Sequence, residues 1–217
     1  MILIPVKNLT TAKQRLASLL DQAQRTALAE AMLHDVFEAV GNCADRPPVA
    51  VVTGDPRATE LAKYFDFEII SDDENRGETA AIRMATQVCE SRGVESTLVI
   101  PGDIPLVWPE DLDKILKAAP PVGSVLVPAA DGRGTNAAFR RPSNLFPLRF
   151  GNDSFKPHFA AARATEKPCI VLVLPRVALD VDNPSDLRAL AAAPGETRAQ
   201  RLARQWNLEE YPVAANE

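Results

Sequence analysis

The sequence is poor in cysteine, histidine and aromatic residues, on which disulfide scaffolds and many metal sites depend. Its 217 residues include two histidines and three cysteines (Cys43, Cys89 and Cys169), and aromatic residues make up 6%. The cysteines are odd in number, lie far apart and form no Cys-x-x-Cys pair, which argues against a disulfide framework and a zinc ribbon. Because reduced cysteines are typical of the cytoplasm, we expect a cytoplasmic protein.

Long apolar runs and a basic surface are also missing. The longest apolar runs, such as residues 170–174, are far shorter than the roughly 20 residues that cross a bilayer. Residues 1–7 show no basic region and no small-residue cleavage site of a secretory signal. Against 29 acidic residues stand 24 Lys and Arg, a net charge of −5, with no basic stripe. We therefore expect neither a membrane nor a nucleic acid as partner.

What the sequence does contain is a regular alternation of short apolar runs and helical patterns. Hydrophobic residues make up 46% and charged residues 24%, the balance of an ordinary globular chain. The apolar runs cover residues 2–6, 49–53, 67–70, 98–101, 124–128 and 170–174. Helical patterns cover a segment that opens with an Asp21–Gln24 capping box, and residues 56–65, 78–92, 109–118, 155–165, 184–192 and 196–205. Continuous apolar runs suit strands that are covered on both faces, so we predict an α/β fold, a mostly parallel central sheet with helices on both faces.

Two segments depart from this alternation. Residues 119–141 contain two strand-like runs around a glycine-rich turn, which predicts a small antiparallel insertion. Beyond Pro194 the chain forms a charged helix and a polar end. We therefore divide the chain into one domain, residues 1–193, and a C-terminal helical tail, residues 194–217.

Three cations follow the first predicted strand. Lys7, Lys13 and Arg15 fall within nine residues at a strand-to-helix junction. Ligands of open α/β sheets bind at the carboxyl ends of strands, where helix N-termini and cations attract phosphate. The alternative is a solvated helix face, and spacing alone does not decide between the two.

Carboxylates follow two other strands. Asp103 follows the fourth apolar run after one glycine, at a place where a carboxylate is costly unless it is paired or binds a metal such as Mg²⁺. A turn aspartate that bonds its own backbone is an equal alternative. Asp180 and Asp182 occupy alternate positions after the last strand and could join Asp103 on one metal. Asp186 suits compensation of the helix dipole.

Two glycine-containing segments are candidates for anion binding. The turn at residues 131–137 could wrap an anion, although most such turns are simple hairpins. Gly151, Ser154 and the start of the next helix could form a second cradle. His158 could donate to a phosphate, but a lone histidine near a helix start is more often a structural hydrogen-bonding residue. His34, in the middle of a helix, is treated as structural.

In their order and spacing, these motifs resemble one family, the 2-phospho-L-lactate or phosphoenolpyruvate guanylyltransferases of deazaflavin coenzyme (F-420) biosynthesis. The matching pieces are Pro5-Val6-Lys7 with Ala12-Lys13-x-Arg15-Leu16, Gly102-Asp103-Ile104-Pro105, Asp131-Gly132-x-Gly134-Thr135-Asn136-Ala137, Phe150-Gly151-x-x-Ser154-Phe155-x-x-His158, and Leu179-Asp180-Val181-Asp182-x-Pro184-x-Asp186-Leu187. They cover the chain up to about Ala193. One departure concerns Gly77-Glu78-Thr79, where the family usually has Gly-Leu-Asn near its guanine pocket; it bears on base selectivity.

The resemblance implies a nucleotide-diphospho-sugar transferase (Rossmann-like) fold, compatible with a homodimer. It also implies transfer of GMP from GTP to the phosphate of phosphoenolpyruvate, 2-phospho-L-lactate or 3-phospho-D-glycerate, with release of pyrophosphate and with Mg²⁺ as cofactor. The implied roles fall on these residues: catalysis on Lys7, Asp103 and Asp182; nucleotide binding on Lys7, Lys13, Arg15, Gly77 and Asp103; acceptor binding on Thr135, Gly151 and Ser154; metal binding on Asp103, Asp180 and Asp182.

Three alternatives stand beside this interpretation. A nucleotidyltransferase for molybdenum cofactor or a sugar phosphate would use a different acceptor. A nucleotide-binding protein without catalysis would fit the departure at Glu78, but it has little need of three carboxylates at strand ends. A Mg²⁺-dependent phosphatase wants a second acid soon after a nucleophilic aspartate, which the stretch after Asp103 does not offer.

Overall fold

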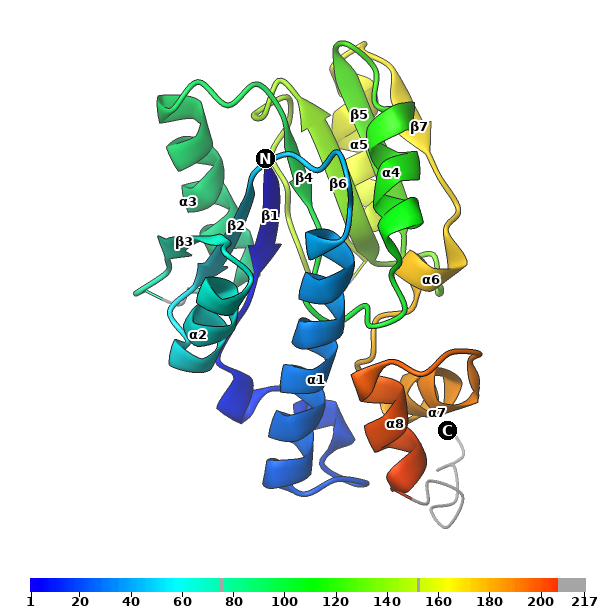
Figure 1. Ribbon diagram of the computed structural model, residues 1–217. Coiled ribbons are helices and arrows are strands. Elements are labelled where there is room, and N and C mark those ends of the chain that lie inside the picture. Colours follow the sequence, from blue (N-terminus) through cyan, green and yellow to red (C-terminus); the bar gives the residue numbers. More distant parts are fainter. Residues whose placement is uncertain (75, 152, 207–217) are drawn as a thin grey trace.

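A seven-stranded sheet forms the centre of the computed structural model, which describes residues 1–74, 76–151 and 153–206. The strand order is β3-β2-β1-β4-β6-β5-β7 (Figure 1). The strands are β1 (Ile2–Pro5), β2 (Val49–Thr53), β3 (Glu68–Ser71), β4 (Thr97–Val99), β5 (Gly123–Pro128), β6 (Thr135–Arg141) and β7 (Cys169–Val171). Within this described part, β6 alone pairs antiparallel with its neighbours, β4 and β5. The predicted α/β fold with a mostly parallel sheet is confirmed.

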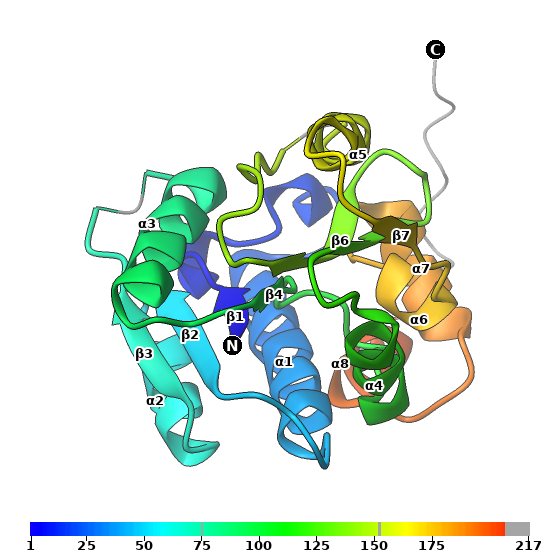
Figure 2. The same cartoon turned by 90° about the horizontal axis from the view of Figure 1, so that it is seen from above.

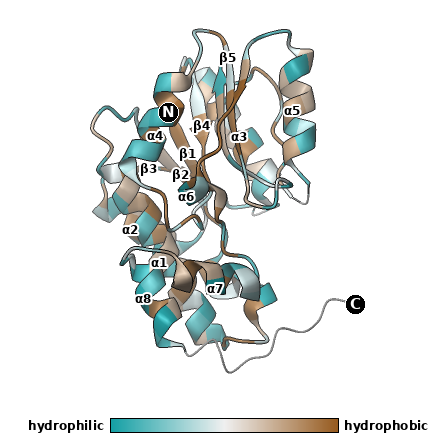
Figure 3. Ribbon diagram, turned by 90° about the vertical axis from the view of Figure 1, so that its right-hand side faces the viewer, coloured by the Kyte–Doolittle hydropathy of each residue, from teal (hydrophilic) through white to brown (hydrophobic). Residues whose placement is uncertain are grey.

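Helices cover both faces of the sheet. The helices are α1 (Gln22–Gly41), α2 (Pro56–Tyr64), α3 (Glu78–Ser91), α4 (Pro109–Ala118), α5 (Phe155–Ala164), α6 (Pro175–Ala178), α7 (Pro184–Ala192) and α8 (Arg198–Gln205). Seen from above, α1, α2 and α4 lie on one face and α3 and α5 on the other (Figure 2). Alternate residues of β1 feed the two cores: Ile2 and Ile4 join the cluster with Phe37 of α1, whereas Leu3 joins Ile82 of α3. Apolar residues concentrate on the central strands (Figure 3).

The helix of the C-terminal tail is packed against the rest of the chain. Ala199 and Ala203 of α8 are buried in a cluster with α1 and α7. The carboxylate of Asp35 in α1 accepts the backbone N–H groups of Arg198 and Ala199, each at 2.9 Å, and so caps the start of α8. The end of the predicted tail, residues 207–217, lies outside the described residues.

Strand β6 determines where the candidate site forms. The predicted antiparallel insertion is confirmed by the β5–β6 pair, but β6 lies in the interior of the sheet, between β4 and β5. Its apolar residues Ala137, Ala138 and Phe139 are buried, which an interior position requires. Because β6 runs opposite to β1 and β4, its first residue, Thr135, lies at the edge where those strands end.

None of the helices in the described ranges is long and apolar enough to span a bilayer. A cytoplasmic location and a homodimer, both expected from the sequence, stay predictions.

Candidate active site

Two pockets meet at the carboxyl edge of the sheet. The β1 pocket, a cavity of 450 Å³, is lined by the residues after β1, among them Lys7, Lys13 and Arg15. The β6 pocket, a cavity of 580 Å³, is lined by Thr135, Ser154 and their neighbours. The residues common to both linings form a shared wall: Arg15, Glu78, Pro101, Asp103 and Asp182. A ligand in one pocket is therefore adjacent to a ligand in the other.

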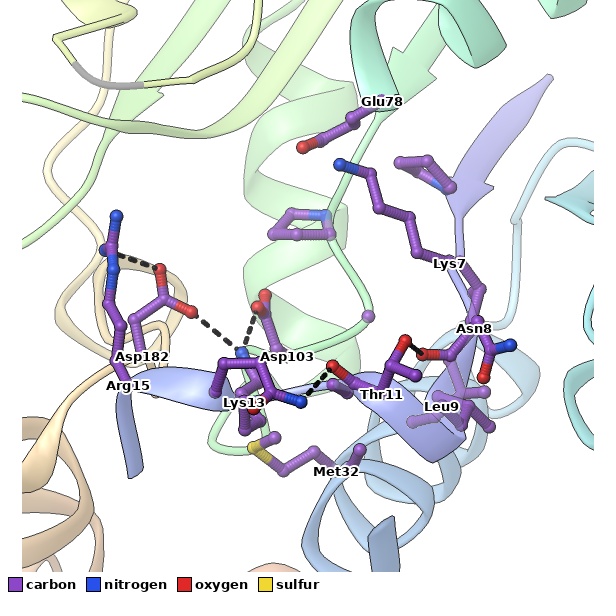
Figure 4. A pocket seen from close by; sticks show the side chains of 18 residues that line it. Lys7, Asn8, Leu9, Thr11, Lys13, Arg15, Met32, Glu78, Asp103 and Asp182 are labelled. Atoms are coloured by element: carbon purple, nitrogen blue, oxygen red, sulfur yellow. Dashed lines mark hydrogen bonds and ion pairs between the residues drawn. The ribbon is translucent and has the colours of Figure 1, made fainter. Parts of the chain in front are cut away.

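Lys13 joins two carboxylates of the shared wall. Its Nζ donates to Oδ2 of Asp103 at 2.6 Å and to Oδ1 of Asp182 at 2.9 Å (Figure 4). Burial alone would lower the pKa of Lys13, but the attraction of the two carboxylates outweighs it and raises that pKa. The same two effects compete at Asp182. Burial alone would raise the pKa of Asp182, but the attraction and hydrogen bond of Lys13 outweigh it, so that pKa is lowered. Lys13 is therefore a charged bridge, not part of a solvated helix face.

The local backbone explains how Lys13 reaches this position. Two short 3-10 turns, Leu9–Thr11 and Gln14–Leu16, replace the regular helix start expected after β1, and Lys13 between them has a left-handed φ of 56°. A Cβ at Gly102 would approach Leu33 of α1 to 2.8 Å, so glycine lets the loop with Asp103 pack closely.

The loop with Asp182 is held by backbone contacts and by a helix cap. The N–H of Val181 donates to the carbonyl of Asp103 at 3.2 Å. Asp186 accepts the backbone N–H groups of Asp182 and Asn183, each at 2.9 Å, as part of the capping box of α7. The structural role predicted for Asp186 is confirmed.

Asp103 and Asp182 provide a donor set that suits Mg²⁺. Their oxygens converge on one cation, Lys13, and Mg²⁺ is commonly held by one or two carboxylates together with substrate phosphates. Asp180 instead accepts Nδ2 of Asn136 at 3.0 Å. Burial raises the pKa of Asp180 to about 6. The hydrogen bond from Asn136 opposes this increase, and the charges of Asp103 and Asp182 add to it. Across the described ranges, no three His, Cys, Asp or Glu side chains are grouped to hold a metal. Of the three predicted ligands, Asp103 and Asp182 therefore meet at one point, beside Lys13, and Asp180 does not.

Lys7 and Glu78 face each other across the β1 pocket (Figure 4). Burial raises the pKa of Glu78 to about 7; repulsion by Asp103 adds to the shift and Lys7 opposes it. Gly77, with a φ of 104°, precedes α3, and its Cβ position would lie 4.0 Å from Nζ of Lys7. The sequence marked Glu78 only as a departure from a motif. Its place in the shared wall depends on tertiary structure, for which no local signal exists.

Arg15 is far more exposed than Lys13. Its side chain is 65% exposed, and Nη1 lies 3.6 Å from Oδ2 of Asp182. Such a distance makes a weak, screened ion pair. Arg15 therefore remains able to turn toward a ligand in either pocket.

The β6 pocket contains two buried hydroxyls beside its charged side chains. Thr135 and Ser154 are buried, and Oγ of Ser154 lies 3.4 Å from Oγ1 of Thr135. Gly151 lines the same pocket with a φ of 130°, a conformation that favours glycine. The three predicted acceptor residues are thus brought together. At the rim, Arg133 pairs with Asp153 at 2.5 Å in an exposed contact.

The turn between β5 and β6 is a hairpin turn that satisfies its own amides. The carboxylate of Asp131 accepts the N–H groups of Arg133 and Gly134, and the carbonyl of Ala129 accepts the N–H of Gly132. These amides are unavailable to a ligand. The expectation that this turn wraps an anion is wrong, and the hairpin alternative holds.

Comparison with known proteins gives a family and a fold. The model of the family described as "Guanylyl transferase CofC like" matches residues 1–213, and so includes α8, which the motifs had left outside the resemblance. The chain is 37% identical to a phosphoenolpyruvate guanylyltransferase of Roseiflexus castenholzii, over 94% of this chain and 93% of that protein. It is 32% identical to a 2-phospho-L-lactate guanylyltransferase of Methanothermobacter thermautotrophicus, over 97% and 92%. A putative nucleotide-diphospho-sugar transferase from Desulfovibrio desulfuricans has the same fold, with a TM-score of 0.78 at 19% identity, covering 97% of this chain and 96% of that one.

Proposed function

The chain belongs to the CofC-like guanylyl transferase family, and from this premise we propose that it transfers GMP from GTP to the phosphate of a small phosphorylated carboxylic acid. One observation carries the proposal: a pocket that contains the cations Lys7 and Lys13 and a pocket that contains the hydroxyls of Thr135 and Ser154 share a wall, where Lys13 joins Asp103 and Asp182. Nucleotidyl transfer needs this arrangement, because two anionic substrates must react side by side.

In the proposed reaction an oxygen of the acceptor phosphate attacks the α-phosphorus of GTP. A new P–O bond forms, the bond from the α-phosphorus to the oxygen that bridges to the β-phosphorus breaks, and pyrophosphate leaves with that electron pair. A phosphate is already an anionic nucleophile at neutral pH, so this step needs no general base. The main barrier is repulsion between the anions, together with the cost of aligning them.

The β1 pocket would hold the nucleotide. Lys7, Lys13 and Arg15 supply positive charge for the phosphates, and Gly77 allows the backbone to approach the base or ribose. Lys13 also offsets the repulsion between Asp103 and Asp182. These two carboxylates would hold Mg²⁺; Asp180, the third ligand that the sequence predicts, is bonded to Asn136 instead. Bound Mg²⁺ would neutralise charge on the phosphates.

The β6 pocket would hold the acceptor. Thr135 and Ser154 offer hydroxyl donors and Gly151 leaves room above the backbone. Neutral hydroxyls bind a carboxylate or phosphate through directional hydrogen bonds. The direction of these bonds therefore sets the position of the acceptor.

Pyrophosphate release from GTP and Mg²⁺ tests the proposal. Phosphoenolpyruvate, 2-phospho-L-lactate and 3-phospho-D-glycerate are compared as acceptors, a sugar phosphate serves as the acceptor control, and ATP and CTP replace GTP as donor controls. We expect turnover with GTP and one phospho-acid. Folded protein that releases no pyrophosphate with any of the three acids contradicts the proposal. Turnover with ATP or CTP would assign a different base selectivity to the pocket beside Glu78.

A further inference from the structure

His158 is a buried histidine whose two ring nitrogens are both hydrogen-bonded. It lies in α5 with 1% of its surface exposed. The backbone N–H of Arg149 donates to Nε2 at 2.7 Å, and Nδ1 lies 2.9 Å from Oγ1 of Thr135. A nitrogen that accepts a hydrogen bond carries no proton, so the proton of the neutral ring is on Nδ1. The backbone of Arg149 thereby fixes His158 as a donor to Thr135.

This donor decides which way the hydroxyl of Thr135 points. A threonine hydroxyl has one proton, and Oγ1 of Thr135 already accepts from Nδ1 of His158. Its own proton cannot point back at a ring nitrogen that carries a proton. Oγ of Ser154, at 3.4 Å, is the other polar atom at hydrogen-bond distance from Oγ1 in the described structure, and a contact of this length holds neither hydroxyl proton firmly. The Thr135 proton is therefore free to point into the β6 pocket, which Thr135 lines.

The arrangement persists at neutral pH. Burial lowers the pKa of His158 to about 4, and the positive charge of Arg140 contributes to the decrease. The opposite tautomer, with the proton on Nε2, would bring that proton against the N–H of Arg149. It would also let Thr135 donate to the ring and present only lone pairs to the pocket, where they would repel an anion.

We propose that His158 is a positioning residue for the acceptor substrate: by donating to Thr135, it turns the Thr135 hydroxyl proton toward a carboxylate or phosphate oxygen in the β6 pocket. This inference rests on the proposed function for the identity of the acceptor. It assigns His158 an effect on the acceptor alone, because its ring nitrogens bond Thr135 and Arg149 and the β1 pocket is lined by other residues.

Two substitutions separate the two hydrogen bonds of His158. In His158→Asn the side-chain amide nitrogen can take the place of Nδ1, which keeps a donor to Thr135 and loses the acceptor for Arg149. In His158→Gln the side-chain carbonyl can take the place of Nε2, which keeps the acceptor for Arg149 and loses the donor. Both variants shrink the same buried ring, so each controls for the packing defect of the other.

The test is the KM of the acceptor against the KM of GTP, measured with the acceptor that supports turnover. We expect His158→Gln to raise the acceptor KM about tenfold, with kcat and the GTP KM within about twofold of wild type, since one oriented hydrogen bond is lost. His158→Asn should restore most of the acceptor KM. Equal effects of the two variants, or parallel increases in both KM values, would indicate a merely structural role and overturn the inference.

A double-mutant cycle with Thr135→Val asks whether His158 acts through that hydroxyl. In the Thr135→Val background, His158→Gln should cause no further increase in the acceptor KM, because the group that it orients is gone. Independent, multiplying effects would overturn the inference.

Calorimetric titration of each folded variant with phosphoenolpyruvate, 2-phospho-L-lactate and 3-phospho-D-glycerate separates this inference from the proposed function. A wild type without turnover whose phospho-acid binding is weakened by His158→Gln and not by His158→Asn contradicts the function and supports the inference. Turnover without this pattern supports the function and overturns the inference. A wild type that binds none of the acids overturns both.

Discussion

The β1 and β6 pockets lie on either side of one wall, yet the hydrogen-bond donors that each adds to this wall differ. The β1 pocket uses charged side chains, Lys7, Lys13 and Arg15, and Lys13 is held by carboxylates. The β6 pocket adds the neutral hydroxyls of Thr135 and Ser154, while its own charged side chains are paired within the protein: Arg133 with Asp153, Asp131 with amides of its turn, Asp180 with Asn136, and Asp186 with the start of α7. Charge attracts a polyanion from many directions, whereas a neutral hydroxyl favours one direction. The difference indicates that one pocket supplies affinity for a highly charged ligand and the other selects the orientation of a smaller one.

The shared wall should be the most sensitive part of both pockets. Asp103→Asn removes one charge at nearly constant shape, and we expect kcat to fall about 10³-fold, because charge stabilisation near the reacting phosphates is lost. Steady-state kinetics with GTP and the acceptor measures this, and circular dichroism checks the fold. Asp66→Asn, which changes an exposed carboxylate in the turn after α2, is the matched control. Near-native turnover of Asp103→Asn would show that the shared wall does not contribute to catalysis.

The titratable groups around the site should respond to acid in different ways. The pKa of His158 is about 4 in the fold, against a usual value of 6.5, so its contribution to stability is present above pH 6.5 and is lost as pH falls toward 4. By pH 4.5 the loss amounts to about 2.5 kcal/mol. Glu78 and Asp180, with pKa values raised to about 7 and about 6, act in the opposite sense, because their contributions are lost as pH rises through those values.

The contribution of His158 is therefore read from a difference between two proteins. We expect the change in unfolding free energy between pH 7 and pH 4.5 to favour His158→Gln over wild type by about 2.5 kcal/mol. Urea titrations of both proteins without added metal measure it. An identical pH dependence of the two proteins would mean that His158 is not held neutral by burial.

Paired substitutions test whether charge and direction serve different substrates. Lys7→Met should raise the KM of GTP about 10- to 100-fold, because a charge-assisted contact is lost, and should leave the acceptor KM within about twofold. Ser154→Ala should raise the acceptor KM about fivefold and leave that of GTP unchanged. Initial rates over a grid of both substrates give the four values. Equal effects on both KM values in either variant would break the division between the pockets.

The smallest effect is expected at the exposed rim of the β6 pocket. Arg133→Ala removes the pair with Asp153, which lies in water and is screened by salt. We expect the acceptor KM to change by about twofold or less at physiological ionic strength. Measurement at low and high salt checks this. A larger change that survives high salt would show that charge, as well as direction, matters on this side.

Much of the fold was predictable because local patterns determine it. The Asp21–Gln24 capping box starts α1 as the sequence indicated, and β2 spans residues 49–53 as predicted. The cations after β1 and the carboxylates after β4 and β7 could be found from the sequence, since parallel strands bring their carboxyl ends to one edge.

The contacts that define the site could not be predicted, because they join distant parts of the chain. Lys13 is separated by 90 residues from Asp103 and by 169 from Asp182, and no local pattern links them. The self-satisfied turn after β5 depends on hydrogen bonds that a glycine-rich sequence does not specify. The tautomer of His158 depends on the backbone of Arg149, which becomes its partner only when α5 packs against the preceding loop.

The most direct test of the central claim follows the oxygen atoms of the acceptor. The acceptor is prepared with ¹⁸O in its phosphate group and incubated with unlabelled GTP and Mg²⁺, and the products are analysed by ³¹P NMR and mass spectrometry. If the acceptor phosphate in the β6 pocket attacks the α-phosphorus of GTP in the β1 pocket, all of the label remains in the new diphosphate product, one labelled oxygen bridges its two phosphorus atoms, and the released pyrophosphate is unlabelled. Label in the pyrophosphate or in free phosphate would contradict the account, because the acceptor would then be the group that is cleaved.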